Sequence, residues 1–173
     1  GKKLIGSSRF QSAVADKEKI MDTAADLIQT SKVIAEKKAA ILKLENQIES
    51  LTPYLSLEVP MNYSGTKKVA MFIGTMAAET QLQDVYSTLA EQLPEVEAVD
   101  IQIISSDQDA VYLAVLCMRK DASKVEEVLR SAGFARPAQL SEEVPSVKTQ
   151  ELKESIQQLN NEIKEQEDKI KSC

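Results

Sequence analysis

The sequence predicts an α+β protein in which a small βαββαβ lobe is inserted between two long helices that form an antiparallel coiled coil. Two observations support this fold class. The two flanks lack proline before Pro53 and after Pro145 and carry apolar residues at heptad spacing, whereas the middle carries short apolar runs with glycine and proline between them. The predicted parts are a first helix over 9–53, a lobe over 57–145 and a second, truncated helix over 146–173.

The first helix is predicted from an apolar repeat of seven residues, which is typical of coiled coils. A second row of apolar residues runs beside the first, and Pro53 ends the helix. The first row is Ile20, Leu27, Ile34, Ile41 and Ile48, and the second is Val14, Met21, Ile28, Ala35 and Leu42.

The second helix repeats this pattern with a narrow apolar seam and polar residues elsewhere. Two such helices that bracket one lobe favour an antiparallel pair over a solvated surface helix. The seam residues are Leu152, Ile156, Leu159, Ile163 and Ile170. Because the second helix is shorter, it can cover the first only as far as Leu27. We therefore expect the chain to be a piece of a longer protein, with self-association through the unpaired end, Phe10 to Ile28.

The middle predicts four strands. The runs 67–75 and 110–118 are apolar on both faces, which is typical of central strands. The run 96–104 alternates, with Val99, Ile101 and Ile103 on the inner side, and 135–140 contains Pro137, which confines it to an edge.

Two helices separate these strands. The first is expected over about 78–93, and the second is expected to start with a capping box of Ser123 and Glu126 and to end at Gly133 in the C′ position. The order βαββαβ with the first and third strands in the centre predicts a ferredoxin-like lobe.

Composition excludes several kinds of chemistry. The chain has no histidine and a net charge of −6, which removes the usual general base and disfavours nucleic-acid binding. Cys117 is expected in the core and Cys173 at the surface, with no zinc site. No apolar run is long enough to span a membrane, so we expect no direct membrane insertion. We predict no catalytic residue, no cofactor and no metal.

Other polar residues predict surface or packing roles. Asp107 and Asp109 are expected in a solvated turn rather than a metal site. The pairs Glu126–Glu127 and Glu142–Glu143 are expected as surface charges. Tyr54 and Tyr63 flank the end of the first helix and are expected to pack there.

The stretch Ser64-Gly65-Thr66-Lys67-Lys68 has the letters of a phosphate-binding loop. It precedes a strand, however, and it lacks the upstream glycine of that motif. We therefore interpret it as a turn. Gly74 and Thr75, predicted between the first strand and the next helix, are better placed for an anion, although a plain turn is the simpler interpretation.

Three segments together resemble the membrane-anchoring subunit I of bacterial V-type (A-type) ATPases, which is similar to eukaryotic subunit a. They are "LTPYLSLEVPMNYSGTKKVAMFIGT", "PEVEAVDIQIISSDQDAVYLAVLCMRKDASKVEEVLRSAGFARP" and the heptad tail. The resemblance implies a stator module at the cytoplasmic face of the cell membrane. It also implies coiled-coil peripheral stalk subunits of the E/G type as partners. The remainder of subunit I and the rotor ring would be reached through the full-length protein.

Two alternatives stay open at this point. A βαββαβ domain with Gly74 at a strand–helix turn is also compatible with an ACT-like domain that binds a small ligand on a coiled-coil arm. A helical hairpin that grips nucleic acid is disfavoured by the acidic charge balance.

Overall fold

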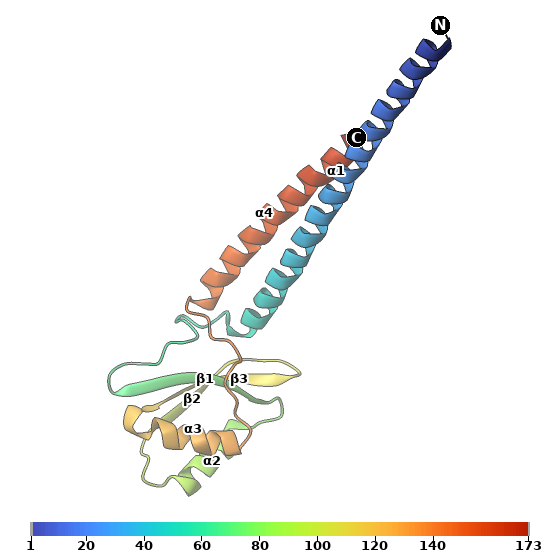
Figure 1. Ribbon diagram of the computed structural model, residues 1–173. Helices are drawn as coiled ribbons and strands as arrows, with labels where there is room; N and C mark the ends of the chain where they lie inside the picture. Colours follow the sequence, from blue (N-terminus) through green and yellow to red (C-terminus); the bar gives the residue numbers. More distant parts are fainter. Residues whose placement is uncertain (1, 173) are drawn as a thin grey trace. The chain divides into compact units, whose positions relative to one another are not determined.

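The computed structural model describes residues 2–172, with side chains from residue 15 onward (Figure 1). The side chains of Phe10, Val14 and Cys173, about which the sequence made predictions, lie outside this range. The chain divides into two compact units. One combines the residues up to Glu45 with those from Glu154, and the other is Asn46–Lys153.

The first unit consists of parts of two long helices. Helix α1 spans Lys2–Leu51 and helix α4 spans Pro145–Ser172. Proline suits the first position of α4 because the amide there has no partner within the helix. In the first unit the two helices run side by side in opposite directions, and Lys37 Nζ lies 2.8 Å from Glu162 Oε2. The predicted pairing of the helices is present, whereas a coiled coil remains a prediction.

The second unit contains a three-stranded antiparallel sheet in the order β1-β3-β2. Strand β1 spans Val69–Ala77, β2 spans Val99–Ser106 and β3 spans Ala110–Met118. Strand β3 is central and pairs along its whole length with β1, from Val69 opposite Met118 to Ala77 opposite Ala110. The protein is thus an α+β fold with a long N-terminal helix and a small sheet.

Two short helices, α2 (Leu82–Gln92) and α3 (Ala122–Ser131), cover one face of this sheet (Figure 1). Their apolar sides and the facing strand residues form the core. Cys117 is buried there, as predicted, and burial raises the pKa of its thiol. The other buried members include Phe72, Met76, Val85, Leu89, Ile101, Val111, Leu113, Val115, Val125, Leu129 and Phe134.

The predicted fourth strand, residues 135–140, is not a strand in the structure. Only Ala135 pairs with β1, through two backbone hydrogen bonds with Thr75 of 2.8 and 3.0 Å. The next residue that would donate to β1 is Pro137, which has no N–H group. The pairing therefore stops after one residue, and the ferredoxin-like lobe with four strands is not established.

The helix predicted to begin near Ala78 begins four residues later, at Leu82. Strand β1 continues to Ala77, two residues beyond its predicted end, because Met76 and Ala77 pair with Val111 and Ala110 of β3. A turn follows, in which the Thr80 amide donates to the Ala77 carbonyl at 3.0 Å, and α2 begins after it.

The predicted capping box of α3 is also wrong, although its predicted end is confirmed. A 3-10 turn, η2 (Arg119–Asp121), leads directly into α3, so that Ser123 lies inside the helix. Gly133 has φ = +102°, and the amides of Gly133 and Phe134 donate to the carbonyls of Arg130 and Leu129. This is the Schellman pattern at a C′ glycine.

Strand β2 departs from the predicted alternation. The register shifts between Ile103 and Ser105, which indicates a β-bulge. In the part of β2 before this shift, Ile101 is buried but Ile103 is 54% exposed rather than inside the core.

Candidate functional site

The segment 52–68, here called the elbow, connects the end of α1 to β1 and lies within the second unit. It begins with a 3-10 turn, η1 (Thr52–Tyr54), where Pro53 prevents the helix from continuing. The Ser105 hydroxyl donates to the Pro53 carbonyl at 2.6 Å, and the Ser56 hydroxyl donates to the Ile104 carbonyl at 3.3 Å. Side chains of the elbow and of β2 therefore fix the end of α1 against the bulged part of the sheet.

An aromatic contact strengthens this attachment. Tyr54 is buried and meets Tyr112 of β3 edge to face, with ring centroids 5.5 Å apart. Burial, followed by the neighbouring Tyr112, raises the pKa of Tyr54 to about 12. The phenol is therefore neutral near pH 7 and acts as a packing group. Tyr63, predicted to pack in the same way, is 38% exposed.

The turn at Ser64–Lys68 carries the sequence that looked like a phosphate loop. Gly65 has φ = +106°, a conformation that side chains with a Cβ rarely adopt, and a Cβ there would collide with the Val69 carbonyl. The Thr66 amide donates to the Val69 carbonyl at 2.8 Å, and the Met71 amide donates to the Ser64 carbonyl at 2.9 Å. The glycine is therefore required by a tight turn before β1.

Arg119, at the start of η2, forms hydrogen bonds to the backbone of this turn. Its guanidinium donates to the carbonyls of Ser64 and Thr66 at 2.9 and 2.6 Å, and its backbone amide donates to Lys68 at 2.8 Å. A phosphate site needs converging N–H groups. Here backbone carbonyl oxygens converge on the guanidinium of Arg119. The turn therefore presents hydrogen-bond acceptors, not the donors that a phosphate would need.

The alternative anion site at Gly74 and Thr75 is contradicted by the position of both residues. They lie inside β1, not at the turn before α2, and Thr75 is paired with Ala135. A Cβ at Gly74 would collide with the Phe134 ring, so this glycine serves close packing. The ACT-like alternative was based on Gly74 at a strand–helix turn, and Gly74 is not at such a turn.

The turn between β2 and β3 is organised by Asp107. Its carboxylate accepts hydrogen bonds from the amides of Asp109 and Ala110 at 2.8 and 2.9 Å and from the Tyr112 hydroxyl at 3.0 Å. The backbone hydrogen bonds hold the pKa of Asp107 below its usual range. Among the described residues, no group of three or more cysteine or carboxylate side chains is placed to hold a metal ion.

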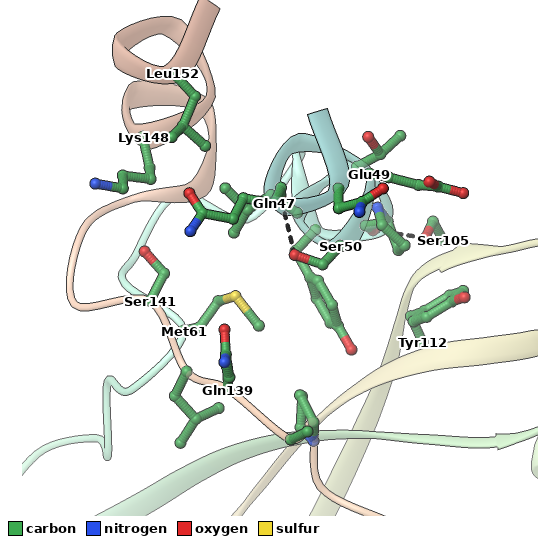
Figure 2. A pocket seen from close by; sticks show the side chains of 18 of the residues that line it. Gln47, Glu49, Ser50, Met61, Ser105, Tyr112, Gln139, Ser141, Lys148 and Leu152 are labelled. Carbon is green, nitrogen blue, oxygen red and sulfur yellow. Dashed lines mark hydrogen bonds between the residues drawn. The ribbon is translucent and has the colours of Figure 1, made fainter. Parts of the chain in front are cut away.

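A groove of about 1240 Å³ lies beside the elbow within the second unit (Figure 2). Its walls come from the last turns of α1, the β2–β3 turn, residues 137–143 and the first turns of α4. Figure 2 shows Met61, Gln139 and Ser141 on one side and Gln47, Ser50 and Tyr112 on the other. The charged lining residues are five carboxylates and one lysine: Glu49, Asp107, Asp109, Glu142, Glu143 and Lys148.

Charged residues are distributed unevenly along the sequence of the second unit. Between Lys68 and Arg119 the chain has eight acidic residues and no basic residue. This span includes all three strands and α2. Of these eight acidic residues, Asp107 and Asp109 line the groove.

The predicted seam residues of the long helices differ in burial. Ile34, Leu152 and Ile163 are buried, and Ile20 is 69% exposed. The remaining six are partly buried: Leu27, Ile41, Ile48, Ile156, Leu159 and Ile170. Ile34, Ile163 and the Lys37–Glu162 ion pair all belong to the first unit, and the seam as a whole stays a prediction.

The sequence did not predict a charged cluster around Glu126. Its carboxylate pairs with Arg136 at 2.6 Å and with Arg130 at 3.0 Å, and the Arg136 guanidinium lies 5.2 Å from the centre of the Phe72 ring. The hydrogen bonds from Arg136 and the charges of both arginines lower the pKa of Glu126. The spacing of Glu126 and Arg130, four residues apart on a helix, could have indicated part of this cluster.

The chain matches no protein-family model and no curated protein sequence. Its fold is similar to a solved structure, the cytoplasmic N-terminal domain of subunit I, homolog of subunit a, of V-ATPase. The TM-score is 0.55 and the sequence identity is 14%, over 82% of this chain. The chain spans about half of that domain, 48% of its length. No helix in the described part of the chain is long and apolar enough to cross a membrane.

Proposed function

We propose that this chain is a stator module of a rotary V-type (A-type) ATPase. In this role it links peripheral stalk subunits to the membrane ion-translocating part and performs no catalysis itself. The observation that carries the proposal is the fold similarity to the cytoplasmic domain of subunit I over 82% of the chain. The remainder of subunit I and the rotor ring are reached through the full-length protein, which places the chain at the cytoplasmic face of the membrane.

The local structure supports a mechanical role. Helix α1 is continuous from Lys2 to Leu51, and the elbow fixes its last turn to β2 and β3 through Pro53 and Tyr54. We propose that α1 and α4 form a coiled coil through the predicted seam, because paired helices resist bending better than one. The lobe is then a ferredoxin-like variant whose fourth strand is reduced to Ala135.

The proposed partner is a coiled-coil stalk of the E/G type with a basic segment. The acidic groove beside the elbow supports this choice, since complementary charge guides and orients association. The affinity of this contact alone need not be high, because several stalks can act together in such an assembly.

Binding of the chain to a purified E/G-type heterodimer tests the proposal. We expect a complex at micromolar concentrations by sedimentation velocity. Neutralising two exposed groove residues, Glu142→Gln with Glu143→Gln, should weaken it about two- to tenfold. The matched control, Glu165→Gln with Glu167→Gln on α4, should not. Absence of a complex at tens of micromolar would contradict the proposed function.

A further inference from the structure

The buried residues that line the groove beside the elbow, here called its floor, are apolar or aromatic. They come from the end of α1, the elbow and the start of α4, all within the second unit. Met61 and Tyr112 lie on opposite sides of the space above them (Figure 2). An aliphatic chain that enters the groove can therefore bury its surface there. The floor residues are Leu51, Tyr54, Met61 and Leu152.

Tyr54 is the floor residue that carries a hydroxyl group. Its ring packs on Tyr112, and the residue is 4% exposed. Within the described part of the chain, however, the hydroxyl has no hydrogen-bond partner, and the phenol is neutral near pH 7. Buried polar groups in folded proteins nearly always have such a partner. Because Tyr54 lines the groove, a ligand with an N–H group can supply it.

The charged residues around the floor are mostly unpaired carboxylates. Asp107 is engaged by the β2–β3 turn and by Tyr112, and Lys148 lies 3.9 Å from Glu151. None of the ion pairs found among the described side chains uses the other four, which are exposed and are here called the rim carboxylates. They are Glu49 on α1, Asp109 in the β2–β3 turn, and Glu142 and Glu143 before α4.

These features together select one chemistry. The side chains of lysine and arginine carry N–H donors on an aliphatic stem that can be buried. An anion would be repelled by the rim carboxylates, and a hydrocarbon would leave the Tyr54 hydroxyl without a partner. The groove volume of about 1240 Å³ exceeds the roughly 300–1,000 Å³ of a typical small-molecule site, so a chain segment fits it better.

We propose that the groove binds a basic helical segment of a partner protein through an inserted lysine or arginine side chain. The N–H group of this side chain donates to the Tyr54 oxygen, and its stem contacts Met61. Neighbouring cations of the segment pair with the rim carboxylates. The inference rests on the proposed function for the identity of the partner, the peripheral stalk, whereas its binding chemistry can be tested without the stalk.

A short synthetic helix of alanine and lysine tests whether the groove binds a basic segment. Fluorescence anisotropy with the complete chain should show binding in the micromolar range that weakens as salt is added. The control peptide, with glutamine in place of lysine, should not bind. No binding of the lysine helix at hundreds of micromolar, or equal binding of the two peptides, overturns the proposal.

Tyr54→Phe tests the inserted side chain. It removes only an unpartnered hydroxyl, so the melting temperature should stay the same or rise. Affinity for the lysine helix should fall about five- to tenfold, because a hydrogen bond to a charged group is lost. Tyr63→Phe is the matched control, since Tyr63 is exposed and does not line the groove. Equal affinities of the two variants would show that no cation reaches Tyr54, which overturns the proposal.

Two further measurements separate the possible outcomes. Spermidine, a free aliphatic polyamine, should displace the lysine helix only at concentrations far above that of the helix. Displacement at equal concentration would mean that the groove takes a free polyamine instead of a protein segment, which overturns the proposed partner.

The E/G-type heterodimer distinguishes this inference from the proposed function. It should bind the Tyr54→Phe variant less tightly than the unmodified chain. Equal binding would overturn the inference and leave the proposed function standing. A chain that binds the lysine helix but not the heterodimer would contradict the proposed function alone.

Discussion

Several single side chains in this protein have specific polar partners, and one buried group in the described part of the chain has none. Arg119 closes the elbow by binding carbonyl groups more than fifty residues earlier in the chain. Glu126 is surrounded by two arginines. Thr149, in the first turns of α4, is buried, and its hydroxyl has no hydrogen-bond partner.

The hydroxyl of Thr149 predicts a stabilising substitution. Thr149→Val keeps the shape of the side chain and removes an unsatisfied polar atom, so it should raise the free energy of unfolding by about 1 kcal/mol. Thr149→Ser, which keeps the hydroxyl and removes a methyl group, should lower it. Urea unfolding measures both, and a destabilised valine variant would show that the hydroxyl has a partner in solution.

Glu126 predicts a pH dependence. Its pKa in the folded protein is lowered. The group therefore stabilises the fold above its unfolded pKa, near 4, and this contribution is lost as the pH falls through the folded pKa. Glu126→Gln should thus be less stable than the unmodified protein at pH 7, and the difference should shrink in acid. Urea midpoints across pH measure this effect, with the exposed Glu127→Gln as control; a constant difference would contradict it.

At the scale of elements, the two positive-φ glycines have different surroundings. A Cβ at Gly65 would collide with backbone atoms of β1, whereas a Cβ at Gly133 meets nothing within 4 Å. Both turns need the left-handed backbone conformation. Only the turn in the elbow also needs a residue without a Cβ atom, because no room is left for one.

This difference predicts unequal costs for the same substitution. Gly133→Ala should lower the free energy of unfolding by about 1 kcal/mol, the cost of the backbone conformation alone. Gly65→Ala should cost more, about 2 kcal/mol or above, because the collision is added. Thermal unfolding of the two variants compares them directly. Equal losses would mean that the turn at Gly65 relaxes freely.

Local patterns predicted those elements that the chain determines locally. The apolar runs of β1 and β3, the buried Cys117 and the C′ glycine Gly133 were all evident from the sequence. The fourth strand was not, because Pro137 has no N–H group to continue the pairing of Ala135 with β1. The starts of α2 and α3 were not, because a turn after Ala77 and the 3-10 turn η2 precede these helices. In the elbow, packing of Tyr54 was predicted, whereas the hydrogen bonds from Arg119 to the turn were not, because they join residues more than fifty positions apart.

At the scale of the whole molecule, the two units carry different spectroscopic reporters. All four tyrosines, Tyr54, Tyr63, Tyr86 and Tyr112, belong to the second unit. Helical circular dichroism is dominated by α1 and α4, the longest helices. Unfolding of the units can therefore be followed separately.

A charge in the contact between α1 and α4 should affect one reporter only. Ile163→Asp buries a carboxylate among apolar groups, so the helical signal should melt at a lower temperature while the tyrosine signal keeps its midpoint. Leu42→Asp, at an exposed position, should change neither. A parallel fall of both midpoints in the Ile163 variant would show that the units unfold as one.

The absence of basic residues between Lys68 and Arg119 has a practical consequence. Trypsin cleaves after lysine and arginine, and it finds no such bond within the sheet or α2. Complete digestion leaves β1, α2, β2 and β3 in one peptide, Val69 to Arg119, while both long helices are cut into short pieces. This single fragment gives a mass-spectrometric label for the lobe, and reagents that target lysine amines leave it unmodified at its side chains.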